Sequence, residues 1–163
     1  MPEVIVDTSP LQYLHQLGHL DLLPFFYGNV LIPEAVVREI ATGRAQGISL
    51  PDLAGLSWIQ VRRVVGQSVL PLVSDLGAGE REVLALALEA KQPLVVLDDK
   101  LARRQAQRFN FSMTGTLGLL LKGKRSGQID QLEPLLDRLA TLNFRLDAAT
   151  RASVLSLAAE ERS

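Results

Sequence analysis

The sequence contains no cysteine among its 163 residues. Disulfide bonds, thiolate nucleophiles and cysteine-based zinc sites are therefore excluded, and the chain is compatible with a reducing compartment. The formal net charge is only -1, which excludes binding of nucleic acid by bulk positive charge but leaves room for a local basic surface. No apolar run approaches the roughly 20 residues of a membrane span, and no basic leader precedes the first predicted strand. We expect a soluble, cytoplasmic protein.

The composition, with 47% hydrophobic and 21% charged residues, is that of a chain that can bury one good core. Nothing in it suggests two domains. We therefore predict a single domain over residues 1–163, with helices in residues 130–163 packed on it. The sequence has no Ser-His-Asp set, P-loop or G-x-G-x-x-G fingerprint, so those types of site are not expected.

The stretch EVIVDTSPL, residues 3–11, predicts one buried strand that ends at Asp7. A short β-branched run bounded by turn residues is typical of a covered parallel strand, and Ser9 followed by Pro10 is a good helix start with Ser9 as the cap. Open α/β sheets bind ligands beyond the carboxyl ends of their strands, which is where Asp7 is expected. Taken alone, Asp7 would be read as a turn residue, so the case depends on other acids at the same edge.

A second strand is predicted over Asn29–Ile32, followed by a helix that begins at Glu34. Glu34 and Glu39 fall on opposite borders of the apolar stripe of this helix. Glu34 is accounted for as a partner of the helix dipole in the first turn, whereas Glu39 is the better candidate to point into a cleft. From Thr42 to Ser57 the chain is rich in Gly, Ser, Ala and Pro, which predicts a long surface loop with one helical turn.

After a predicted short strand and an irregular connection over residues 65–74, LGAGEREVLALALEAK predicts a helix that ends near Lys91. On a helical wheel Glu80 falls on the inward stripe, whereas Glu82 lies about 200° away and is expected to face solvent. A carboxylate on an inward face needs a partner such as a metal, a base or the helix N-terminus. We therefore take Glu80 as a candidate site residue.

Leu94–Leu97 predicts the second strongly buried strand, and it also ends in carboxylates, Asp98 and Asp99. One of the two is expected to point into the crevice while the other caps the helix that begins at Lys100. The sequence leaves open which of them does so. Two covered strands that each end in aspartate favour a functional role for Asp7.

No acidic residue occurs between Asp99 and Asp130, whereas basic residues are frequent there. The block favours an anionic substrate, with Lys100, Arg103 and Arg108 as candidate residues to hold flanking phosphates. The helix after Gly115 could bind phosphate at its N-terminus or tie back to the sheet. Two further helices, opened by Asp130 and Asp147 as caps, are expected to complete the core, form a dimer face or receive a partner peptide.

Together the candidate acids are Asp7, Glu39, Glu80 and one or both of Asp98 and Asp99. Ligand sets made only of oxygen suit hard cations such as Mg²⁺ or Mn²⁺, which bind through a few carboxylates, water and substrate phosphate. Without a cation, so many carboxylates at one edge would repel one another. With a cation, such a site could activate water for attack on a phosphodiester.

The motifs DTSPL, IPEAVVREI, GAGEREVLALAL, VVLDDKLARRQAQRF and MTGTLGLLL follow one another in an order that resembles PIN-domain proteins. Within that family the chain is similar to the uncharacterised bacterial and archaeal branch related to VapC toxins. The resemblance implies a three-layer α/β/α sandwich with a central, mainly parallel sheet. It also implies a Mg²⁺- or Mn²⁺-dependent ribonuclease, usually the toxin of a type II toxin-antitoxin pair and often a homodimer.

The resemblance assigns roles to particular positions. The catalytic and metal-binding acids of the family match Asp7, Glu39, Glu80 and Asp99, and Ser9 matches a small hydroxyl residue that supports the site. Two departures stand out. Thr-x-Asp is common where this chain has Leu97-Asp98-Asp99, and the third acid is more often Asp than Glu. Asp98 could share the metal-binding role of Asp99.

The leading hypothesis is a metal-dependent endoribonuclease that hydrolyses RNA, with a possible cognate antitoxin as partner. The alternative is a non-catalytic PIN-like module for RNA binding or protein interaction. A third option is a hydrolase of small phosphate esters, which would not need the basic stretch.

Overall fold

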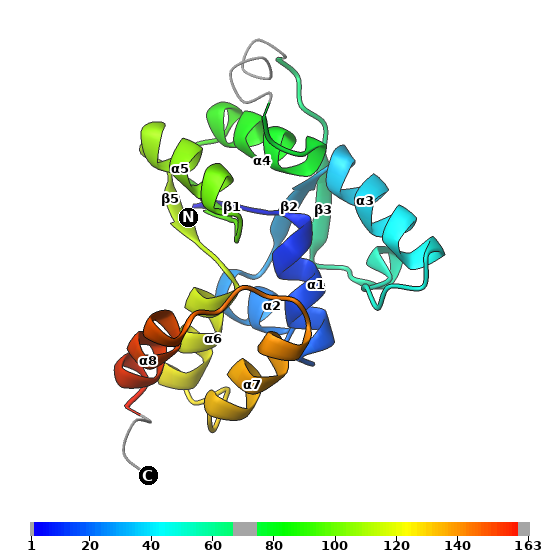
Figure 1. Ribbon diagram of the computed structural model, residues 1–163. Coiled ribbons are helices and arrows are strands. Elements are labelled where there is room, and N and C mark those ends of the chain that lie inside the picture. Colours follow the sequence, from blue (N-terminus) through cyan, green and yellow to red (C-terminus); the bar gives the residue numbers. More distant parts are fainter. Residues whose placement is uncertain (1, 67–74, 160–163) are drawn as a thin grey trace.

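The computed structural model describes residues 2–66 and 75–159. In this part of the chain the strands form one parallel sheet of five strands in the order β3-β2-β1-β4-β5 (Figure 1). Their bounds are β1 Glu3–Val6, β2 Val30–Pro33, β3 Ile59–Arg62, β4 Pro93–Val96 and β5 Ser112–Thr114. The predicted strands are therefore present, each shifted by at most a few residues.

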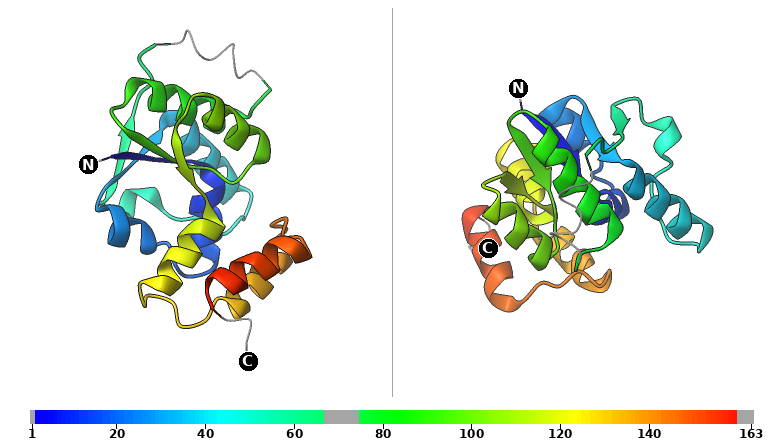
Figure 2. Two further views of the ribbon diagram at one scale, coloured as in Figure 1. Left: turned by 90° about the vertical axis from the view of Figure 1, so that its left-hand side faces the viewer. Right: turned by 90° about the horizontal axis from the view of Figure 1, so that it is seen from above.

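Helices cover both faces of the sheet, which makes the three-layer α/β/α architecture predicted from the sequence (Figures 1 and 2). One face carries α4 and α5, and the other carries α1, α2 and α6, with α7 and α8 beyond α6. The bounds are α1 Thr8–Gln16, α2 Leu22–Tyr27, α3 Glu34–Ala45, α4 Ala78–Glu89, α5 Lys100–Arg108, α6 Thr116–Arg125, α7 Glu133–Thr141 and α8 Ala148–Leu157, with a short 3-10 helix at Leu53–Gly55. No described helix has the length and apolar character needed to cross a membrane.

The two central strands explain why the site residues meet. β1 and β4 both end in apolar, mostly β-branched residues, and Val6 pairs with Val96 in a parallel register. The amide of Asp7 continues this pairing by donating to the carbonyl of Val96 at 3.1 Å. The chain after β1 and the chain after β4 therefore leave the sheet side by side at its carboxyl edge.

The strand order reverses at this point. From β1 the chain proceeds through β2 to β3 on one side, whereas β4 and β5 lie on the other side. The gap between the connections that leave β1 and β4 is thus a topological switch point, where open α/β sheets place their ligands. The candidate acids after β1 and β4 stand at this switch point.

One prediction about local structure was wrong in the α3 region. The loop expected from Thr42 begins later, because α3 continues to Ala45. Gly43 is buried there and faces Leu50, whose side chain would collide with a Cβ at that position. Packing of Leu50 therefore extends the helix through residues that read locally as loop. Of the irregular connection predicted for residues 65–74, residues 67–74 lie outside the described part.

Two of the predicted caps also differ. Asp7 rather than Ser9 occupies the N-cap position of α1, although its side chain makes no capping hydrogen bond, and Ser9 lies in the first turn of the helix. Leu132, not Asp130, precedes α7, whereas Asp147 does cap α8 and accepts a hydrogen bond from the amide of Thr150 at 2.7 Å. The helix after β1 thus begins two residues closer to the strand than the Ser9-Pro10 pair suggested.

Candidate functional site

Asp7 is the most deeply buried acid at the carboxyl edge of the sheet, with 4% of its surface exposed. Its Oδ1 atom has no hydrogen-bond partner within the described residues. Desolvation raises the pKa of this carboxyl from 3.8 to about 8, and the backbone N–H of Thr8 offsets only part of that shift. The neighbouring charges of Glu80, Glu39 and Asp98 raise the pKa further. Three acids from three other parts of the chain therefore raise the pKa of the buried Asp7 carboxyl.

Glu39 reaches the same place from the middle of α3. Its Oε1 accepts a hydrogen bond from the hydroxyl of Thr8 at 2.6 Å, and its Oε2 accepts one from the amide of Gly79 at 3.0 Å. A Cβ at Gly79 would lie 3.0 Å from Oδ1 of Asp7 and closer still to Glu39. The absence of a side chain at Gly79 is what lets these two carboxylates approach α4.

Glu80 follows Gly79 and is half-buried in the first turn of α4. Its Oε1 accepts a hydrogen bond from the amide of Gly77 at 3.1 Å. Burial raises the pKa of Glu80, and the charges of Asp99 and Glu39 add to this effect while the Gly77 amide opposes it. Glu80 therefore lies close enough to both Glu39 and Asp99 for their charges to raise its pKa.

The structure gives Asp98 and Asp99 different surroundings. Asp98 points inward, where its Oδ1 and Oδ2 accept hydrogen bonds from the amide and the hydroxyl of the buried Thr116, each at 2.7 Å. Asp99 is exposed and caps α5 by accepting from the amide of Ala102 at 3.0 Å. The helix after Gly115 therefore ties back to the sheet through Asp98.

Desolvation raises the pKa of Asp98, although several donors oppose the rise. The amide and hydroxyl of Thr116 and the hydroxyl of Ser9 lower the pKa by hydrogen bonding, and the positive charge of Arg103 lowers it as well. Ser9 is thus in contact with one of the candidate acids, and its role in supporting the site stays a prediction. Arg103 donates to the carbonyl of Leu97 at 2.9 Å and so braces the end of β4.

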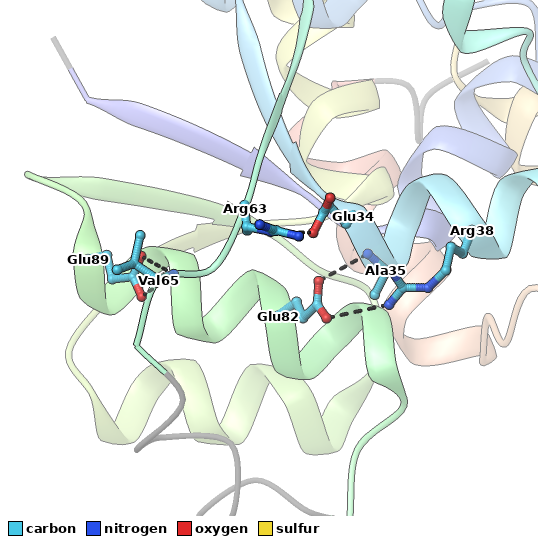
Figure 3. A network of polar contacts seen from close by, with 7 residues as sticks. All are labelled: Glu34, Ala35, Arg38, Arg63, Val65, Glu82 and Glu89. Carbon is cyan, nitrogen blue, oxygen red and sulfur yellow. Dashed lines mark hydrogen bonds and ion pairs between the residues drawn. The ribbon is translucent and has the colours of Figure 1, made fainter.

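Glu34 and Glu82 lie outside this cluster, in the contacts between α3, α4 and β3 (Figure 3). Glu34 pairs with Arg63 at 3.3 Å. The prediction that Glu82 faces solvent is wrong. Its side chain is only 23% exposed and accepts a hydrogen bond from the amide of Ala35 at 3.0 Å. The helical wheel gave the right direction for Glu82, but the N-terminus of α3 occupies that side of α4.

The basic residues divide into two groups. Lys100, Arg104 and Arg108 are exposed on α5, where Arg104 and Arg108 line a surface hollow together with Leu101, Gln105 and Gln107. The basic residues of α6 make contacts with other parts of the protein. Lys122 lies over the rings of Phe26 and Tyr27, Lys124 donates to the carbonyl of Asp130, and Arg125 donates to that of Leu157.

The residues at the switch point fit a hard divalent cation in chemical type, because they offer only carboxylate and hydroxyl oxygens and include the unpartnered Oδ1 of buried Asp7. No group of three or more acidic or histidine side chains in the described part is arranged to hold a metal ion as it stands. Glu39 and Asp98 instead use their oxygens for hydrogen bonds to Thr8, Gly79 and Thr116. Cation binding would therefore require these side chains to turn.

Comparison with known proteins decides the family. A family model described as a PIN domain matches residues 3–160. The chain belongs to the PIN-domain family. A search of curated protein sequences gives no match. PIN domains have a nuclease-type fold, and the all-parallel sheet with helices on both faces agrees with it.

Three residues that shape the candidate site of this PIN domain were not predicted. Thr8 holds Glu39, Gly79 makes space for Glu39 and Asp7, and Thr116 holds Asp98. Thr8 stands next to Asp7 and could have been noticed as a hydroxyl at the strand end. Gly79 and Thr116 carry no local signal, because their roles depend on segments that are distant in sequence.

Proposed function

We propose that the protein is a metal-dependent endoribonuclease that hydrolyses RNA phosphodiester bonds. The observation that carries this proposal is the buried Oδ1 of Asp7, which lacks a partner and lies within the field of other carboxylates. A buried carboxylate is costly unless a cation or proton compensates it. Asp7, Glu39, Glu80 and Asp99 would hold Mg²⁺ or Mn²⁺, and Asp98 is a further candidate ligand.

A divalent cation bound there would supply an activated water and stabilise the charge of the transferring phosphate. The protein's own residues keep the acids in place. Thr8 and the Gly79 amide orient Glu39, and the Gly77 amide orients Glu80. Ser9 and Thr116 fix Asp98 beside Asp7.

The basic surface of α5 supports RNA as the substrate, because it begins directly after the acids that follow β4. Lys100 and Arg108 are exposed and could neutralise the phosphates that flank the scissile bond. Arg103 is half-buried and bonded to Leu97, so its contribution to RNA binding would be through positioning the strand end. The toxin role, a cognate antitoxin, a homodimer and a cytoplasmic location belong to the same proposal and follow from the family resemblance.

The proposal is tested by incubating the protein with structured RNA and Mn²⁺. We expect cleavage that disappears with EDTA and falls at least about a hundredfold in Asp7→Asn, since the change removes the central buried carboxylate. Glu89→Gln is the matched control, because Glu89 is an acid of α4 that bonds only the distant amides of Val65 and Gly66 among the described contacts. It should leave cleavage unchanged.

Activity that survives Asp7→Asn would contradict the proposal. RNA binding without cleavage in the wild-type protein would favour the alternative, a non-catalytic PIN-like module. That alternative draws support from the way Glu39 and Asp98 are already engaged in internal hydrogen bonds.

A further inference from the structure

The helices α3 and α4 share a feature at their N-termini. The residue before α3 is Pro33 and the residue before α4 is Gly77, and neither has a side-chain oxygen that could accept from the first turn. Free amides at a helix start normally find such an acceptor. In α4 the helix's own Glu80 accepts from the amide of Gly77, but in both helices the acceptor for the amide of the second residue comes from the other helix.

The two caps are reciprocal. Glu39 of α3 accepts from the amide of Gly79, the second residue of α4, at 3.0 Å. Glu82 of α4 accepts from the amide of Ala35, the second residue of α3, at 3.0 Å. Figure 3 shows the second of these bonds, with Glu82 reaching from α4 to the start of α3.

Glu82 is therefore placed to act on the candidate site without touching it. Its bond to Ala35 fixes the start of α3 against α4, and one turn further along the same helix Glu39 bonds back to α4 beside Asp7. Arg38 lies 3.6 Å from Glu82, but its side chain is 65% exposed, so this ion pair adds little. The hydrogen bond to the Ala35 amide is the contact that matters.

We propose that Glu82 is a positioning residue that holds Glu39 at the site through this reciprocal cap. The two caps form one coupled unit, so loss of the Glu82 bond weakens the Glu39 bond to Gly79 and displaces the Glu39 carboxylate. The consequence for RNA cleavage rests on the proposed function, but the coupling between the caps does not.

The test measures amide hydrogen exchange by NMR on the full-length, ¹⁵N-labelled protein without added metal. In Glu82→Ala we expect the protection of both the Ala35 and the Gly79 amides to fall by about five- to tenfold, the factor that one helix cap is worth. Glu89→Ala is the matched control, because Glu89 also lies on α4 and accepts from distant backbone amides, those of Val65 and Gly66. It should leave Ala35 and Gly79 protected.

Loss of protection at Ala35 alone would overturn the proposal, because Glu82 would then be only a local cap. Glu82→Gln covers the case in which the alanine variant does not fold, since its amide oxygen can still accept from Ala35. We expect both amides to stay protected in that variant. Lost protection at Gly79 with Ala35 still protected would equally overturn the coupling.

Cleavage assays give a second measurement. Glu82→Ala should reduce turnover of RNA by about tenfold, as the loss of an outer-shell support typically does, and Glu82→Gln should restore most of it. A glutamine variant as impaired as the alanine variant would contradict a positioning role. If the wild-type protein cleaves no RNA, the proposed function fails, whereas the exchange experiment still decides whether the caps are coupled.

Discussion

Asp7 makes the stability of the metal-free protein depend on pH. Its pKa is about 8 in the folded protein, against an ordinary value of 3.8, mainly because the carboxyl group is desolvated. Between these two values the folded state keeps a proton that the unfolded chain releases. The stabilisation is therefore fully present below the ordinary pKa and is lost as the pH rises through about 8. Asp7 alone contributes a slope of at most about 1.4 kcal/mol per pH unit.

We predict that Asp7→Asn flattens this dependence, because asparagine does not titrate. Urea unfolding in EDTA between about pH 5 and pH 8 measures the free energy of unfolding of both proteins. The wild-type protein should lose stability across this range more steeply than the variant. Glu80 and Asp98, whose pKa values are also raised, contribute a common background to both. Equal slopes would show that Asp7 titrates normally.

Gly79→Ala should distinguish an effect on the candidate site from an effect on the stability of the fold. A Cβ there would push on the Glu39 carboxylate and on Oδ1 of Asp7, so Glu39 must leave its bonds to Thr8 and the Gly79 amide. The cost of these bonds, about 1 kcal/mol each, is offset in part by the better helix propensity of alanine, also about 1 kcal/mol.

We therefore expect a melting temperature within a few degrees of the wild type and RNA cleavage reduced at least about tenfold. Gly55→Ala is the control, since a Cβ at Gly55 meets nothing within 4 Å. Full activity in Gly79→Ala would mean that the position of Glu39 is unimportant.

At the residue scale the sequence indicated most of the acids but not their environment. Helical periodicity was enough to select Glu80, because an inward stripe fixes the direction of a side chain. It did not choose between Glu34 and Glu39, and Glu39 was preferred because Glu34 is accounted for as a partner of the helix dipole. Periodicity could not decide between Asp98 and Asp99. The alternation of side chains between the two faces of a strand stops where the chain turns into a helix. The structure shows that Asp99 serves as the cap and Asp98 points inward.

At the scale of elements, Asp98 joins β4 to α6 through Thr116. The hydroxyl of Thr116 is buried and donates to Oδ2 of Asp98 at 2.7 Å. Thr116→Val keeps the shape but removes this donor, which leaves a desolvated carboxylate short of one hydrogen bond. We predict a loss of about 1–3 kcal/mol in the free energy of unfolding near neutral pH.

Thr141→Val provides the comparison, because Thr141 is exposed and, among the described residues, its hydroxyl donates to the nearby carbonyl of Arg138 alone. Its effect on urea unfolding should stay within about 0.5 kcal/mol. Equal losses in the two variants would show that the Asp98 contact does not tie α6 to the sheet.

The presence and order of the helices and strands could be predicted from the sequence, because buried parallel strands and amphipathic helices have distinct periodicities. The residues at which helices end, and the segments that pack beside them, could not be predicted. α3 runs on to Ala45 because Gly43 accommodates Leu50, and Glu82 is covered because α3 begins beside it. Both facts depend on contacts between distant segments, which a helical wheel does not contain.

At the scale of the whole molecule, the reversal of strand order between β1 and β4 gathers acids from four parts of the chain. The parallel sheet and its two helical layers confirm the predicted architecture, and the match to the PIN domain covers residues 3–160. The expectation of one domain over residues 1–163 stays a prediction. The central claim is that this gathering of acids creates a site for a divalent cation.

Isothermal titration calorimetry with Mn²⁺ tests that claim most directly. Asp7 is largely protonated near neutral pH, because its pKa is about 8. Binding of Mn²⁺ must therefore release about one proton, which appears as a dependence of the heat on the ionisation enthalpy of the buffer. We predict saturable binding with this proton release in the wild-type protein and in Glu89→Gln, and loss of both in Asp7→Asn. Binding that is absent in the wild type, or unchanged in Asp7→Asn, would contradict the account.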